Sequence, residues 1–119
     1  MPSVRETLSS VCPQVEGQLK PHLSGLFSGL VKGYLPQAWT FTTEEGTATL
    51  RVDKQGNASV ADGVVAPLDV SVSLNQAQLE WALIDQGRGP RPAGQEPSIE
   101  FYSDKGQTAF QFLRSRFKL

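Results

Sequence analysis

The chain has 119 residues, of which 39% are hydrophobic and 19% are charged. This length excludes two full domains, but a chain of this size can bury roughly two thirds of its surface, which is enough for a hydrophobic core. The net charge of -1 provides no positive field that would attract phosphate backbones or anionic lipid, which argues against nucleic-acid binding. We expect a single domain over residues 1–119, with a helical part (1–36) and a sheet-and-helix core (37–119).

The start of the chain carries no targeting signal that we can identify. The first ten residues include Arg5 and Glu6 and lack the apolar run of a signal peptide. The charge-free stretch 21–31 is interrupted by serines and glycines and is shorter than the ~20 apolar residues that span a bilayer. These features predict a cytoplasmic protein without a transmembrane segment.

An amphipathic helix is predicted at the N-terminus. Ser3 followed by Glu6 has the form of a capping box, and apolar residues then recur at steps of three and four. These residues are Val4, Leu8, Val11, Val15 and Leu19. We expect the helix to be kinked at Pro13, and we expect Cys12, which continues the apolar series, to be a structural rather than a reactive thiol.

A second apolar series follows Pro21, includes Phe27 and predicts a further short helix. Gly25, Gly29 and Gly33 form a separate stripe on it at steps of four. Because glycine costs about 1 kcal/mol per helical position relative to alanine, the stripe needs a reason. Tight packing on a sheet is the favoured interpretation, and ligand access or a segment that loosens is the alternative.

From residue 38 onward the hydrophobic period changes to two, which is typical of strands. The alternation predicts five strands, at Trp39–Glu44, Ala48–Asp53, Ala58–Ala61, Leu68–Leu74 and Ile99–Tyr102. Tight turns join the first three strands into an antiparallel meander with one apolar face. We expect the polar face of the fourth strand to meet water.

Helices and a loop complete the predicted core. Asn75 with Gln78 three residues later predicts an N-capped helix of about ten residues that Gly87 ends. The stretch 87–97 is rich in proline and glycine, which predicts a loop. After the last strand, apolar residues on one face predict a closing helix that runs to Phe117.

Few residues could support catalysis. His22 is the only histidine and Cys12 the only cysteine, so a nucleophilic triad lacks a base and a zinc site lacks three or four ligands. The Gly-Arg-Gly segment at 87–89 is followed by Pro90 and Pro92, which remove N–H donors that a phosphate loop would use. We therefore predict no catalytic residue, no metal site, no cofactor and no enzymatic activity.

The order of elements and one local pattern resemble a known family. The segment 68–75, with the sequence LDVSVSLN, followed by Leu79 and Leu83, resembles a stand-alone, prokaryotic-type member of the sterol carrier protein (SCP) domain family. In that family an Asp-containing alternating strand leads into a short helix with two leucines. The segment 39–50 is similar to the family's opening hairpin, and the segment 103–113 is similar to its last helix.

The resemblance implies an α+β fold with N-terminal helices and a mainly antiparallel sheet of about five strands, covered on one face by helices. An apolar cavity between the layers would bind a lipid, a sterol or another apolar or amphipathic small ligand without turnover. The alternative is a protein-interaction or accessory module that uses the same groove, in one form as a homodimer. The loop 87–97 stands where the family has an apolar helical stretch, which predicts a shallow or open cavity.

The resemblance also suggests which side chains meet the ligand. The apolar lining would consist of aromatic and leucine side chains, namely Phe27, Trp39, Phe41, Leu79, Trp81, Leu83, Phe101, Phe110, Leu113 and Phe117. Ordinary core packing is the alternative explanation for most of them. Arg88 and Arg91 would bind the ligand's headgroup, because arginine pairs bidentately with a carboxylate or a phosphate.

Overall fold

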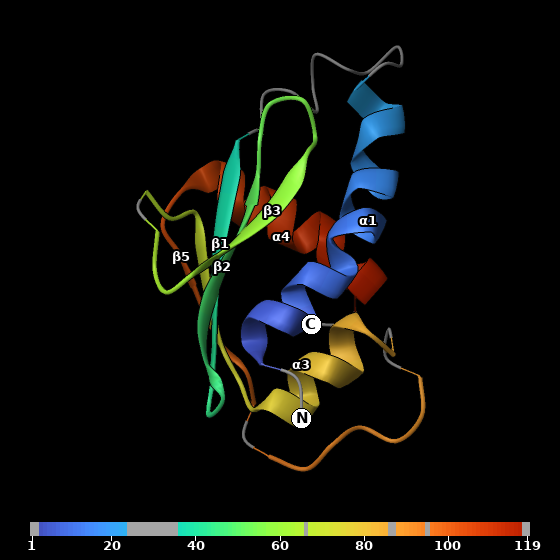
Figure 1. Ribbon diagram of the computed structural model, residues 1–119, viewed down its shortest axis with the longest axis vertical. Helices are drawn as coiled ribbons and strands as arrows, with labels where there is room; N and C mark the ends of the chain where they lie inside the picture. The colour runs from blue at the N-terminus through green and yellow to red at the C-terminus, as the bar shows by residue number, and fades with distance from the viewer. Residues whose placement is uncertain (1–2, 24–35, 66, 86–87, 95, 118–119) are drawn as a thin grey trace.

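The computed structural model describes residues 3–23, 36–65, 67–85, 88–94 and 96–117, with side chains throughout except at 18–23 and 112–117. The elements are α1 (Val4–Leu23), β1 (Gln37–Thr43), β2 (Gly46–Val52), β3 (Ala58–Asp62), β4 (Val70–Ser73), α3 (Gln76–Leu83), β5 (Ser98–Phe101) and α4 (Asp104–Phe117) (Figure 1). The predicted α+β architecture is confirmed. The second helix predicted after Pro21, with its glycine stripe and Phe27, lies outside the described residues.

The five strands form one sheet in the order β3-β2-β1-β4-β5. β1 pairs antiparallel with β2 and parallel with β4, while β3 and β5 pair antiparallel with their neighbours. The sheet is therefore mainly antiparallel, as predicted, but it contains one parallel pair. β1 and β3 run in the same direction, because both are antiparallel to β2, and the crossover after β3 returns the chain so that β4 runs in this direction too.

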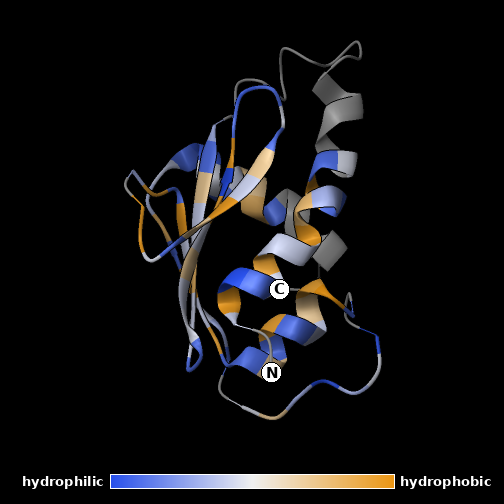
Figure 2. Ribbon diagram, viewed as in Figure 1, coloured by the Kyte–Doolittle hydropathy of each residue, from blue (hydrophilic) through white to orange (hydrophobic). Residues whose placement is uncertain are grey.

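Strand alternation directs the apolar residues to the face that the helices cover. Trp39 lies opposite Leu50 on β2 and Val70 on β4, so these side chains share one face. The buried core cluster on this face joins the sheet to α1, α3 and α4 and consists of Val4, Leu8, Val11, Val15, Trp39, Phe41, Ala48, Leu50, Val52, Val70, Val72, Leu79, Leu83 and Phe110. Figure 2 shows hydrophobic and hydrophilic segments alternating along α1, as expected for an amphipathic helix.

The opposite face of the sheet is polar, yet part of it is buried. Thr40 and Thr49 are almost fully buried there, and their hydroxyl groups lie 2.8 Å apart. Thr49 Oγ1 also donates to the carbonyl of Gly63 at 2.7 Å and accepts from the amide of Val65 at 3.3 Å. The crossover between β3 and β4 therefore covers this face, and the Thr49 hydroxyl forms hydrogen bonds with backbone groups of the crossover.

α1 begins as predicted and ends later than predicted. The amide of Glu6 donates to Ser3 Oγ at 3.2 Å, and all the apolar positions up to Val15 are buried. The helix continues through Pro13 and Pro21 to Leu23 instead of giving way to a second helix at Pro21. Each proline removes one helical hydrogen bond, but the regular burial of one face stabilises the helix across Pro13.

α3 has the capping box that the sequence predicts. The Asn75 side chain accepts from the amide of Gln78 at 2.7 Å, and the Gln78 side chain accepts from the amide of Asn75 at 3.0 Å. The helix ends at Leu83 with Ile84 as its C-cap, before the Gly87 that was expected to end it.

The start of β4 packs closely against α4 at Gly106. A Cβ atom on Gly106 would lie 2.6 Å from the carbonyl oxygen of Asp69 and 2.8 Å from its Cβ. The amide of Tyr102 donates to the same carbonyl at 2.8 Å, so the backbone at Asp69 cannot easily retreat. Only glycine allows α4 to approach β4 this closely.

We expect Gly106→Ala to lower the free energy of unfolding by about 1–3 kcal/mol, the usual cost of overpacking. Gly17 is the matched control, because it lies on α1 with nothing within 4 Å of the corresponding Cβ position. Gly17→Ala should stabilise the protein by up to about 1 kcal/mol through helix propensity. Urea unfolding measures both changes, and equal effects of the two substitutions would contradict the close approach of α4.

Candidate functional site

The candidate site is a row of three aromatic rings between the sheet and α4. The ring centroids of Trp39 and Phe110 are 5.3 Å apart with a tilt of 45°, and those of Phe110 and Phe101 are 5.7 Å apart in an edge-to-face arrangement. Trp39 and Phe110 are buried, whereas Phe101 on β5 is 40% exposed. The row therefore leads from an open edge of the sheet into the interior.

The polar atoms beside this row are paired with one another. Trp39 Nε1 donates to Gln37 Oε1 at 2.8 Å, and Gln37 Nε2 donates to the carbonyl of Lys105 on α4 at 3.1 Å. Within the described part of the chain, no buried side-chain nitrogen or oxygen lacks a hydrogen-bond partner. The interior beside the rings is thus apolar. Its buried side-chain donors and acceptors already have partners, so none is left to bind a polar group of a ligand.

The other end of the layer, between α1, α3 and β1, is held by a buried polar network. Gln76 is fully buried; its Oε1 accepts from Thr43 Oγ1 at 2.9 Å, and its Nε2 donates to Thr7 Oγ1 at 2.9 Å. The carboxylate of Glu44 accepts from the amide of Gln76 at 2.8 Å, where the N-terminus of α3 favours negative charge. Sequence reasoning missed Gln76, because a glutamine at the start of a short helix carries no periodic signal.

The structure brings most of the predicted lining residues together and separates one from them. Phe41, Leu79 and Leu83 join Trp39 and Phe110 in the buried core cluster, and Phe101 lies at its edge. Of the other predicted lining residues, Leu113 and Phe117 lie on α4, in the part whose side chains the structure does not describe. Phe27 lies outside the described residues.

Trp81 packs with the loop that follows α3 rather than with the row of rings. Its Nε1 donates to the carbonyl of Gly89 at 3.3 Å, and the guanidinium of Arg91 lies 5.8 Å from its ring centroid. Arg91 also pairs with Glu96 at 3.5 Å, and Arg88 Nε donates to the carbonyl of Asp85. Both arginines are exposed, so their charges face solvent at the surface of this loop.

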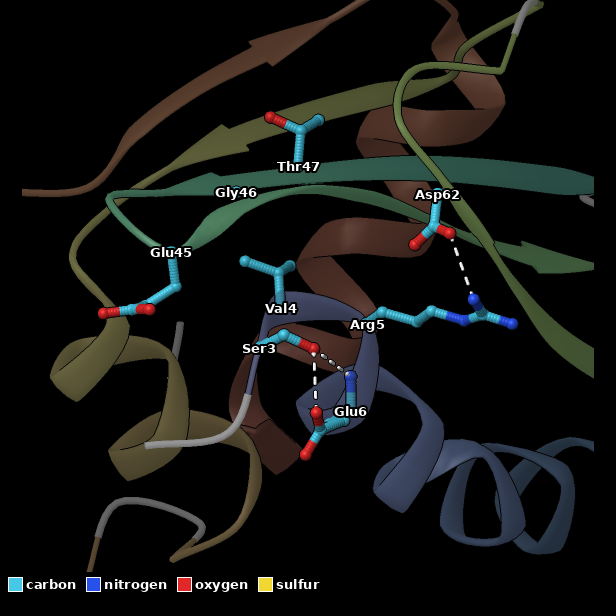
Figure 3. Close-up of a pocket in the computed structure, with 8 residues that line it drawn as sticks. All are labelled: Ser3, Val4, Arg5, Glu6, Glu45, Gly46, Thr47 and Asp62. Atoms are coloured by element: carbon cyan, nitrogen blue, oxygen red, sulfur yellow. Dashed lines mark hydrogen bonds and ion pairs between the residues drawn. The ribbon is translucent and has the colours of Figure 1, made fainter.

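A pocket of about 480 Å³ lies elsewhere, where the first turn of α1 faces the β1–β2 turn and the end of β3 (Figure 3). Its lining includes the acids Glu6, Glu45 and Asp62, and Arg5 pairs with Asp62 at 3.0 Å. None of the predicted ligand-binding residues lines it. Its surplus of carboxylates makes it a poor site for an anionic headgroup.

Cys12 is half-buried on α1, and its thiol lies 3.5 Å from the carbonyl of Leu8. Burial and the nearby charge of Glu16 raise the pKa of the thiol. His22 lies in the last turn of α1. Among the described residues there is no group of three histidine, cysteine or acidic side chains that could hold a metal ion.

The helices that the structure describes include none long and apolar enough to cross a membrane. No protein-family model matches the sequence, and no curated protein matches it significantly.

Solved structures do match the fold. A structure described as a UbiJ-SCP2 ubiquinone synthesis protein aligns over 99% of this chain and 96% of its own, with 12% identity and a TM-score of 0.55. Sterol Carrier Protein 2 Like 2 from Aedes aegypti aligns over 92% of this chain and 98% of its own, with 14% identity and a TM-score of 0.49. A palmitated SCP2L2 from the same organism aligns over 92% and 91%, with 19% identity and a TM-score of 0.46. The first alignment shows that the chain has the sterol carrier protein fold, as the resemblance implied.

We expect the Cys12 thiol to react slowly with iodoacetamide at pH 8, because its raised pKa leaves little thiolate at that pH. Glu16→Gln removes the negative charge but keeps a side-chain oxygen that can accept from the amide of Ala58, as Glu16 Oε1 does at 2.9 Å. This variant should react faster than the unaltered protein. Mass spectrometry of timed samples measures both rates, and a rate equal to that of a free cysteine peptide would contradict the raised pKa.

Proposed function

We propose that the protein binds a lipid or another apolar or amphipathic small molecule between the sheet and the helices, without chemical turnover. The row of rings from Phe101 through Phe110 to Trp39 carries the proposal, because it joins an exposed edge to an apolar interior. The shared sterol carrier protein fold supports it.

The two ends of the interlayer space resist opening differently, which suggests where the ligand enters. At the α3 end, the buried side chain of Gln76 would lose its hydrogen bonds to Thr43 and Thr7 if the elements separated. Each buried donor or acceptor left without a partner costs about 1–3 kcal/mol. At the other end, hydrogen bonds from Gln37 to the carbonyl of Lys105 and from Ser103 to Asp69 hold only the start of α4. One turn later Phe110 meets ring surfaces, which a ligand could replace with its own apolar surface. We therefore propose entry between β5 and α4.

The proposed lining begins with Phe101, Phe110 and Trp39, and continues with the deeper residues Phe41, Leu79 and Leu83. Phe27, Trp81, Leu113 and Phe117 remain proposed lining residues, and Arg88 and Arg91 remain proposed headgroup residues. Because the described interior leaves no polar atom free, we expect the polar end of the ligand to stay at the surface. The absence of turnover is proposed because the sequence has a single imidazole and a single thiol.

Affinity should rise with the length of the bound chain. We expect saturated fatty acids of increasing length to bind about fourfold more tightly per methylene, since each contributes about 0.8 kcal/mol, until the space is full. The tryptophan emission of a Trp81→Phe variant reports on Trp39 alone and should change saturably. An affinity that does not depend on chain length, or an emission that never changes, would contradict binding beside Trp39.

Phe101→Ala should weaken fatty-acid binding several-fold, because it removes the outermost ring of the row. Val64→Ala is the matched control: Val64 is 65% exposed and lies in the crossover from β3 to β4, which covers the other face of the sheet. We expect this control to bind normally. Titration with one fatty acid measures both variants, thermal melting verifies that they fold, and equal affinities would remove Phe101 from the site.

Replacing Arg88 and Arg91 together with alanine tests the headgroup role. Each exposed charge pair contributes about 0.2–1 kcal/mol, so the double variant should bind a fatty acid several-fold more weakly than the unaltered protein. A fatty alcohol of equal length, which has no charge, is the control ligand and should bind both proteins equally. Parallel weakening of both ligands, or of neither, would show that these arginines do not contact the headgroup.

A further inference from the structure

The two edges of the sheet are protected differently. At the β3 edge, Glu16 on α1 accepts from the amide of Ala58 at 2.9 Å, and Arg5 on α1 pairs with Asp62 at 3.0 Å. At the β5 edge, the strand Ser98–Phe101 is exposed at every position except Ile99, which is half-buried. Within the described ranges, no strand pairs with the outer side of β5. An edge of this kind can accept a further strand.

The hydrogen-bonding pattern shows which backbone groups of β5 point outward. The amide of Tyr102 donates to the carbonyl of Asp69, and Ser71 and Ser73 lie opposite Glu100 and Ser98. Because alternate residues of an antiparallel strand face the partner, the N–H and C=O groups of the intervening residues face away from β4. These are the groups of Ile99 and Phe101, which each offer one donor and one acceptor.

The side chains at this edge combine apolar surface with a negative charge. Phe101 is 40% exposed and Tyr102 is 56% exposed, and they are two of the four large hydrophobic residues that are exposed among those described. The Tyr102 hydroxyl donates to the carboxylate of Glu100 at 2.8 Å, and this bond and charge raise the pKa of Tyr102. A phenol is protonated at neutral pH, so this hydrogen bond holds the Glu100 carboxylate beside Tyr102.

We propose that the β5 edge binds an extended segment of another protein, in which apolar side chains alternate with lysine or arginine. The backbone of the segment would pair with Ile99 and Phe101, its apolar side chains would lie beside theirs, and its basic side chain would lie opposite Glu100. Added strands of this kind take affinity from the main chain and specificity from alternate side chains. The charge of Glu100 selects a basic partner, since opposite charges across strands stabilise a pair and like charges destabilise it.

A second copy of this chain fits the edge less well. Two antiparallel β5 strands use all their outward groups only when Ile99 lies opposite Phe101 of the other copy. That register places the two Glu100 residues directly opposite each other in a non-hydrogen-bonded pair, in which the side chains of the two strands lie closer together. Glu100 therefore works against self-pairing while it favours a basic segment.

The test uses three synthetic octapeptides: one alternating valine and lysine, one alternating valine and glutamate, and the first with alternate amides N-methylated. Amide chemical shifts of the unaltered protein are followed by NMR during titration. The lysine peptide should shift and protect the amides of Ile99 and Phe101. The glutamate peptide should bind several-fold more weakly at low salt, and N-methylation of the pairing amides should abolish binding.

Glu100→Lys supplies the reciprocal test and should reverse the preference in favour of the glutamate peptide. Glu45→Lys is the matched control, because Glu45 is an exposed acid in the β1–β2 turn, and it should leave the preference unchanged. The proposal is overturned if the N-methylated peptide binds as well as its parent or if both charges bind equally. It is also overturned if the unaltered protein alone protects Ile99 and Phe101 on concentration, which would identify a second copy as the occupant. The peptide comparison decides the matter even if Glu100→Lys fails to fold.

Discussion

Asp69 is a buried carboxylate at the point where the chain, having crossed the sheet, enters β4. Its Oδ2 accepts from the amide of Ala38 at 2.9 Å, and its Oδ1 accepts from Ser103 Oγ at 2.6 Å. Its own amide donates to the carbonyl of Ala38 at 2.8 Å, and Lys105 Nζ lies 3.8 Å from Oδ1. One side chain thereby fixes the start of the parallel pair to β1 and the start of α4. A buried charge is tolerated only when it is bonded in this way, so these segments must assemble together.

The position of α4 that Asp69 fixes determines the proposed site. Gly106 lets the first turn of α4 rest on the Asp69 backbone, and one turn later Phe110 reaches between Trp39 and Phe101. The parallel pairing of β1 with β4 places Trp39 and Val70 on the same face, which keeps this side of the sheet apolar. The arrangement of the three rings thus depends on the hydrogen bonds of Asp69, which lie at the border of the apolar layer.

Much of the fold could be predicted because its signals are local. The spacing from Val4 to Val15, the period-two strands and the capping box at Asn75 depend on residues close in sequence, and the structure contains all three. The parallel pair could not be predicted, because alternation gives the same pattern for either strand direction. Gln76 was missed for a related reason: its partners Thr7 and Thr43 are distant in sequence, and only the tertiary structure makes a buried glutamine favourable.

The prediction for the site was less complete, because helical spacing places a residue on a face but does not say what covers that face. Trp81 follows Leu79 by two positions on α3 and therefore points away from the face that Leu79 and Leu83 bury. The loop after α3 covers it instead, through the carbonyl of Gly89 and the guanidinium of Arg91. This loop therefore contacts one of the predicted lining residues through a hydrogen bond and a cation–π contact. Of the other predicted lining residues, Phe110 and Phe101 lie on α4 and β5, between which we propose that the ligand enters.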